Sequence, residues 1–113
     1  MLNDPKLSET ASTSIADREN LCLVSAASQW EVAIKISVGK YRISDDFETL
    51  WNDVLSRFAT LNIEPRHTAK LISLPFHHKD PFDRLLIAQS LAEQIPVISS
   101  DAVLDAYGIQ RIW

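Results

Sequence analysis

Two aspartates at the ends of one short stretch, Asp83 and Asp101, are the residues of this sequence best placed to do chemistry. Asp83 lies in the first turn of a helix that we expect to begin at Asp80, and Asp101 follows a short apolar strand. Glu31 lies near the start of another helix that also follows a strand. In a parallel sheet with crossover helices, strand ends and helix starts share one edge, so we expect all three acids at that edge. Such carboxylates repel one another unless a hard cation binds between them. Oxygen ligands suit Mg²⁺ or Mn²⁺, which activate water against phosphodiesters.

Each of these acids also has an ordinary structural explanation. Any acid in a first helical turn is favoured by the helix dipole, which explains Asp83, and Asp101 can cap a short helix after it. Glu31 can pair with Lys35 one helical turn later. The functional interpretation rests on the convergence of the three. The adjacent His77 and His78 point in different directions in a loop, so we interpret both as loop residues rather than ligands.

The elements that must position the acids follow from caps and apolar periodicity. The main helix begins at its N-cap Asp80, with Pro81 in the first position, and Pro96 ends it. Further helices are expected at residues 5–18, from the cap Ser25 to about Val38, from the cap Asp45 or Asp46 through Phe58, and from about His67 to Ser73. Strands are expected at Leu21–Val24, Leu61–Ile63, Val97–Ile98 and Ile109–Trp113, with a short helix at Ala102–Tyr107. This order predicts an α/β fold with a parallel sheet, in a single domain of residues 1–113.

Two of these helices carry apolar stripes that we expect to face the core. The first contains Trp30, Ala33, Ile34 and Ser37 or Val38, and the second contains Phe47, Leu50, Trp51, Val54, Leu55 and Phe58. The aromatic residues of the second stripe also suit a cofactor site or a dimer face, although core burial is the better explanation.

Composition excludes several classes of protein. The 15 acids and 11 bases give a net charge of −4, which argues against a domain that holds nucleic acid mainly through a basic surface. A nuclease stays open, because bound cations reverse the field of an acidic site. The single cysteine, Cys22, lies in an apolar run and is expected in the core. The sequence has no apolar run of about 20 residues and a polar N-terminus, so we expect a cytoplasmic protein without a membrane span. Only Gly39 and Gly108 are glycines, which excludes a phosphate-binding glycine loop.

Three segments, VSAASQWEVAIKISVGK, DPFDRLLIAQS and ISSDAVLDAYGIQRIW, closely resemble the PIN-domain ribonucleases, in particular the VapC-type toxins of bacterial toxin-antitoxin pairs. The resemblance covers essentially the whole chain. It implies a PIN-like, Rossmann-like three-layer fold with a central parallel sheet flanked by helices, and a Mg²⁺-dependent endoribonuclease activity (Mn²⁺ being the alternative ion). The acids of the family fall on Glu31, Asp83 and Asp101 as catalytic and metal-binding residues, with Ser100 and Asp80 as secondary candidates. The implied partners are an RNA substrate and a cognate antitoxin protein, and self-association as a homodimer is a further expectation.

The chain departs from the family at its start. The family begins with a strand and helix that carry a first acid in a segment of the form LLDTHxLLW, and the segment LNDPKLS follows them. We therefore expect an N-terminally truncated PIN-like domain, and we do not assign the role of the first acid to Asp4. Two hypotheses follow. The chain is either a metal-dependent endoribonuclease, or a weak or inactive remnant that acts as an antitoxin-binding or other protein-binding module.

Overall fold

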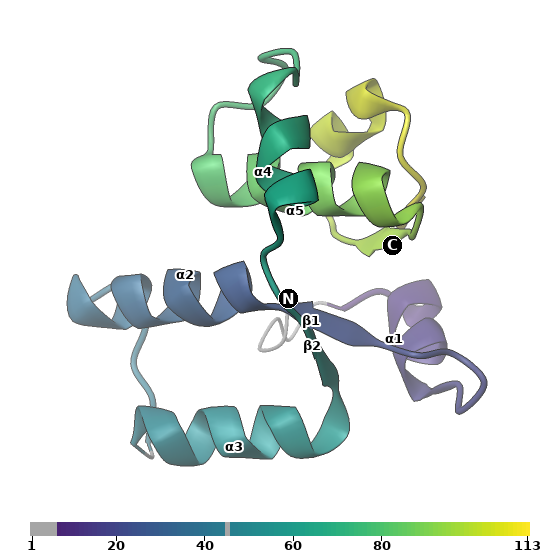
Figure 1. Cartoon of the computed structure of the whole chain (residues 1–113). Coiled ribbons are helices and arrows are strands. Elements are labelled where there is room, and N and C mark those ends of the chain that lie inside the picture. The colour runs from purple at the N-terminus through teal and green to yellow at the C-terminus, as the bar shows by residue number, and fades with distance from the viewer. Residues whose placement is uncertain (1–6, 45) are drawn as a thin grey trace. The chain divides into compact units, whose positions relative to one another are not determined.

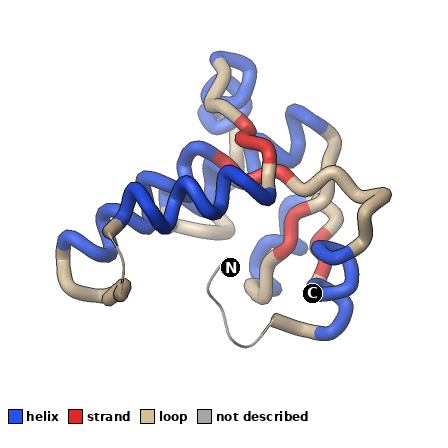
Figure 2. Tube along the Cα trace, turned by 90° about the horizontal axis from the view of Figure 1, so that it is seen from below, coloured by secondary structure: helices blue, strands red, loops and turns tan. Residues whose placement is uncertain are grey.

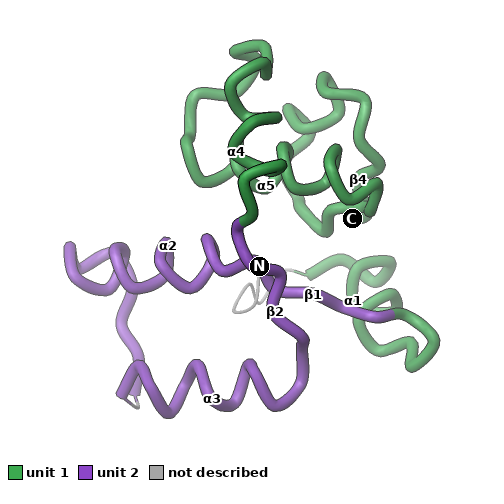
Figure 3. The backbone as a smooth tube through the Cα atoms, viewed as in Figure 1, with its two compact units in different colours: residues 1–20, 64–113 green, residues 21–63 purple. Residues whose placement is uncertain are grey.

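The chain divides into two units in a computed structural model that describes residues 7–44 and 46–113 (Figure 3). Unit 1 combines Met1–Asn20 with Glu64–Trp113, and unit 2 is Leu21–Ile63. Asp4 and Asp45 lie outside the described residues. That the two units form one domain over residues 1–113 stays a prediction.

Unit 2 contains two short parallel strands and two helices. Strand β1 is Leu23–Ser25, helix α2 is Ala26–Ser37, helix α3 is Phe47–Arg57 and strand β2 is Ala59–Leu61 (Figure 1). β1 and β2 pair in parallel, with Val24 opposite Thr60. Helix α2 begins where expected, because the Ser25 hydroxyl accepts a hydrogen bond from the N–H of Ala27 at 3.1 Å.

The buried side chains of unit 2 include Val24, Ala27, Trp51 and Val54. The expected stripe of α3 is therefore confirmed at Trp51 and Val54 but not at Leu55, which is 45% exposed. The expectation that Trp30 belongs to the core is also wrong, since Trp30 is 63% exposed. The reason is the length of the strands. Three strand residues extend about 10 Å, whereas the 12 residues of α2 extend about 18 Å, so the sheet is too short to cover the whole of α2, whose one buried residue is Ala27 in its first turn.

Unit 1 contains helices, a 3₁₀ helix and the second pair of strands. Its elements are α1 (Glu9–Ala16), α4 (Pro65–Ile72), α5 (Pro81–Glu93), β3 (Val97–Ile98), the 3₁₀ helix η1 (Ala102–Tyr107) and β4 (Arg111–Ile112). Strands β3 and β4 pair in parallel, with Val97 opposite Arg111. The core cluster of this unit is built from α5, η1 and the loop after α4, and consists of Leu74, Ile87, Ala88 and Leu104.

Helix α5 and its N-cap carry two of the five expected site residues, Asp80 and Asp83. The carboxylate of its N-cap, Asp80, accepts hydrogen bonds from the N–H groups of Phe82 at 2.8 Å and Asp83 at 3.1 Å, which confirms the predicted start. Its end comes earlier than predicted. Gln94, in the left-handed region with φ of 56°, is the C-cap, and Pro96 lies beyond it.

Other boundaries differ from expectation by a few residues. Strand β2 comes two residues earlier than predicted, at Ala59–Leu61, because it begins directly after α3. Helix α1 is shorter than residues 5–18, of which residues 5 and 6 lie outside the described part.

The strands form two separate two-stranded sheets within the described residues (Figure 2). A single central sheet therefore stays a prediction. None of the helices in residues 7–44 and 46–113 is long and apolar enough to span a membrane.

Candidate active site

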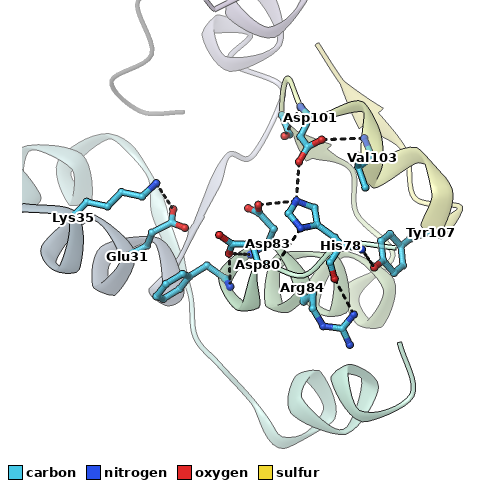
Figure 4. A network of polar contacts seen from close by, with 11 residues as sticks. Glu31, Lys35, His78, Asp80, Asp83, Arg84, Asp101, Val103 and Tyr107 are labelled. Atoms are coloured by element: carbon cyan, nitrogen blue, oxygen red, sulfur yellow. Dashed lines mark hydrogen bonds and ion pairs between the residues drawn. The ribbon is translucent and has the colours of Figure 1, made fainter. Parts of the chain in front are cut away.

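Asp83 and Asp101, which are 18 residues apart in the sequence, meet in unit 1 at the same nitrogen of one histidine ring (Figure 4). The Nε2 atom of His78 lies 2.8 Å from Oδ2 of Asp101 and 3.0 Å from Oδ2 of Asp83. One ligand atom from each of the three residues lies within 4.8 Å of the others. The His78 side chain is 16% exposed, and those of Asp83 and Asp101 are 35% and 38% exposed. The cluster is therefore reachable from solvent on its carboxylate side.

Asp83 owes its position to the start of α5. The Asp80 side chain fixes the first turn of this helix through hydrogen bonds from the two N–H groups that follow it, and Asp83 is the third helical residue. These hydrogen bonds explain the presence of Asp80 by its role as the N-cap of α5. Its expected secondary role at the site stays a prediction.

Asp101 has two functions at once, because its two carboxylate oxygens face different groups. Oδ1 accepts a hydrogen bond from the N–H of Val103 at 3.0 Å and so caps η1, while Oδ2 faces His78. The cap that offered an ordinary explanation for Asp101 is thus present, yet it leaves the second oxygen at the site. The N–H of Asp101 donates to the Ser99 hydroxyl at 3.1 Å, whereas Ser100, the serine named from the sequence, lies in an exposed bend.

Arg111 of β4 holds the backbone just before Asp101. Its guanidinium donates to the carbonyl oxygen of Ser99 at 3.1 Å and to both carboxylate oxygens of Asp105, at 2.9 and 3.1 Å. These hydrogen bonds lower the pKa of Asp105. Asp105, and through longer-range attraction Asp101, raise the pKa of Arg111. The Arg111 guanidinium thus joins Asp105 of η1 to the backbone two residues before Asp101.

Three hydrogen bonds of its backbone and side chain hold His78 in place. Its N–H donates to the Tyr107 hydroxyl at 2.8 Å, its carbonyl oxygen accepts from Arg84 at 3.4 Å, and its ring Nδ1 accepts from the N–H of Asp80 at 3.1 Å. Because Nδ1 is an acceptor, the proton of the neutral ring is on Nε2, which faces the two carboxylates.

Both histidines lie in the loop before α5, as expected, but the sequence interpretation did not place His78 at the site. The two rings do point in different directions, as expected, because the ring of His77 packs edge-on against Tyr107 with centroids 5.1 Å apart. His78 nevertheless turns into the site. The available signal was its position two residues before an N-cap aspartate and five before a first-turn aspartate, a spacing that places its ring over the start of the helix.

Glu31 lies on α2 in unit 2, and its Oε1 is 3.9 Å from Nζ of Lys35. This is the i, i+4 pair that the sequence offered as its ordinary explanation. A role for Glu31 beside Asp83 and Asp101 stays a prediction.

The donor set fits a hard divalent cation. Two carboxylate oxygens from separate segments converge on one point, and the group that faces them there carries a partial positive charge, the Nε2–H of His78. Mg²⁺ and Mn²⁺ prefer such oxygen ligands, and water completes their coordination.

The comparison with protein families matches this chain to the PIN domain over residues 1–110, and the chain belongs to this family. PIN domains have an α/β fold, are nucleases that act on RNA and generally use divalent metals, so membership indicates nuclease activity in general. Searches of the curated proteins and of the solved structures find no match to the chain.

Proposed function

We propose that this protein is a Mg²⁺-dependent endoribonuclease of the VapC toxin type, in which Asp83 and Asp101 bind the ion. The observation that carries the proposal is the convergence of their Oδ2 atoms on one point, 3.0 and 2.8 Å from His78 Nε2, in a chain of the PIN family. The Nε2–H of His78 compensates the two carboxylates in this structure, and a divalent cation would supply a larger compensation at the same two oxygens.

The division of work between residues follows from their contacts. Asp101 binds with the oxygen that does not cap η1, and Asp83 binds from the rigid first turn of α5. Arg111 holds the backbone at Ser99, two residues before Asp101, and so helps to fix the position of this acid. A bound divalent cation would activate a water molecule and neutralise charge on the scissile phosphate.

Glu31 is proposed as a third acid of the site. This assignment comes from the resemblance of VSAASQWEVAIKISVGK to the family segment and is tested by substitution. An RNA substrate, a cognate antitoxin and a cytoplasmic location complete the proposal.

A protein-binding module without turnover is the second candidate. The observation that favours it is the apolar surface of α2 and its C-cap, where Trp30 and Val38 are mostly exposed. Such a surface suits a protein partner such as an antitoxin.

RNA cleavage decides between the two candidates. A labelled mixed-sequence single-stranded RNA is incubated with the protein and Mg²⁺, Mn²⁺ or a chelator, and with Asp83→Asn and Asp101→Asn. We expect metal-dependent cleavage that falls on the order of 100-fold or more in each variant, because a misplaced or weakly held ion loses its alignment. Asparagine keeps an oxygen that can cap a helix, so both variants should fold.

The matched control is Asp53→Asn, which makes the same charge change at an exposed acid of α3. Cleavage that persists with chelator, or in Asp83→Asn, contradicts the nuclease proposal. No cleavage by the wild-type protein under any condition favours the binding module.

A further inference from the structure

We propose that the Nε2–H of His78 occupies the acid pair in the metal-free protein, and that a divalent cation binds Asp83 and Asp101 only when the His78 ring moves away from them. This inference rests on the proposed metal site at Asp83 and Asp101. It adds a residue that the acidic pattern of the sequence does not contain, and it states what that residue does before the ion binds.

The first step is the identity of the atom between the acids. The N–H of Asp80 points at Nδ1 of His78, with a nitrogen–nitrogen distance of 3.1 Å, and a backbone N–H can only donate. Nδ1 must therefore present a lone pair, and the neutral ring carries its proton on Nε2. The group that faces Asp83 and Asp101 at 3.0 and 2.8 Å is an N–H donor.

The second step is that His78 is not arranged to be a metal ligand. A ligand nitrogen must offer its lone pair, so ligation through Nε2 would place the proton on Nδ1. That proton would then face the N–H of Asp80, which is fixed because Asp80 is the N-cap of α5. Two N–H donors, those of Asp80 and Nδ1, would then face each other. The hydrogen bond from Asp80 therefore favours a His78 ring that donates from Nε2 to the acids over a ring that ligates an ion.

The third step is the rigidity of the backbone that carries His78. The N–H of His78 donates a hydrogen bond to the Tyr107 hydroxyl of η1, and the buried Arg84 of α5 donates one to the Pro75 carbonyl oxygen of the preceding loop. Rotation of the ring out of the site must break its contacts with both carboxylates while the backbone stays in place. The donor thus keeps Asp83 and Asp101 together in the metal-free protein, and it competes with any cation for the same two oxygens.

Calorimetry of Mg²⁺ and Mn²⁺ binding at neutral pH tests the competition. His78→Phe keeps a ring of similar size but has no donor, so we expect its affinity to rise about tenfold, equivalent to about 1.4 kcal/mol. His78→Gln retains a side chain that can both donate and accept, and we expect an affinity close to that of the wild type. His77→Phe, the same change one residue earlier, is the matched control and should leave the affinity unchanged.

A second readout is independent of affinity. Nitrogen-15 NMR of the histidine side chains in the metal-free protein should show His78 protonated on Nε2, and Mg²⁺ should shift its ring signals while those of His67 stay in place. Weaker binding by His78→Phe would show that His78 assists ion binding, as a ligand or by holding the acids in place, rather than competing with the ion, and would overturn the inference. Unchanged binding would overturn it as well. If neither the wild type nor His78→Phe binds either ion, the proposed metal site itself is contradicted. If NMR shows the proton on Nδ1 in the metal-free protein, the inference about His78 is refuted, while the proposed metal site is not affected.

Discussion

Arg84 fixes the loop that carries His78, and it does so with a charge that is almost removed from water. The side chain is 6% exposed and donates to the carbonyl oxygens of Pro75 at 2.8 Å and Leu74 at 3.3 Å. Its guanidinium also lies over the ring of Phe76, 4.0 Å from the centroid. These contacts satisfy carbonyl groups that the loop cannot pair within itself, so the conformation of the loop depends on Arg84.

Arg84→Met should destabilise the protein by roughly 2–4 kcal/mol, because methionine fills similar space but removes the donor of the Leu74 carbonyl group and leaves the Pro75 carbonyl group with the Tyr107 hydroxyl as its donor. Urea denaturation at neutral pH measures this change. Arg57→Met, at an exposed arginine that pairs with Asp53 at the end of α3, should change the stability by no more than about 0.5 kcal/mol. Equal effects of the two substitutions would show that the loop does not depend on Arg84.

The local roles of the acids could be predicted at this scale, whereas the contact of His78 with Asp101 could not. Asp80 and Asp83 follow from helix-start chemistry that acts over three residues. The contact of His78 with Asp101 joins residues 23 apart and depends on Arg84 and Tyr107, whose partners are backbone atoms of a loop. Such a contact leaves no periodic pattern in the sequence.

Helices α4 and α5 are joined by a polar cluster around the fully buried His67. Its Nδ1 accepts from the N–H of Glu64 at 3.0 Å, and its Nε2 lies 2.7 Å from Oε1 of Glu93. Arg66 forms a hydrogen-bonded ion pair with the same carboxylate. Hydrogen bonds from His67 and then Arg66 hold the pKa of Glu93 below its usual value of 4.5.

This lowered pKa predicts a loss of stability in acid. An acid whose pKa is lower in the folded protein contributes stability above its unfolded pKa, and that contribution disappears as the pH falls through the folded value. The stability measured by urea denaturation should therefore fall as the pH drops below about 4.5. The fall should be smaller in Glu93→Gln, while Glu19→Gln, an exposed acid outside the helices, should behave like the wild type. Identical pH profiles for all three proteins would exclude this role of Glu93.

Helix starts were more predictable than strand positions at the scale of elements. Ser25, Asp46 and Asp80 all cap the helices that follow them, because a cap is a bond between near neighbours. Strands of two or three residues carry too few positions for a pattern, and β2 was misplaced for this reason. The exposure of Trp30 depends on how far a sheet extends over a helix, which periodicity does not encode.

At the scale of the whole molecule, three segments in the correct order identified the chain as a PIN domain, and the family match over residues 1–110 confirms this. Two of the three proposed acids, Asp83 and Asp101, lie in unit 1 and are brought together by α5 and the turn before η1. The third, Glu31, lies in unit 2. The central claim is therefore that Asp83 and Asp101 bind one ion together.

Calorimetry of Mg²⁺ binding to the wild type, Asp83→Asn, Asp101→Asn and the double variant measures this most directly. Each single substitution should weaken binding at least about tenfold, and the double variant should lose less than the sum of the two single losses, because both acids act on one ion. Wild-type affinity in either single variant, or losses in free energy that simply add, would contradict a shared site.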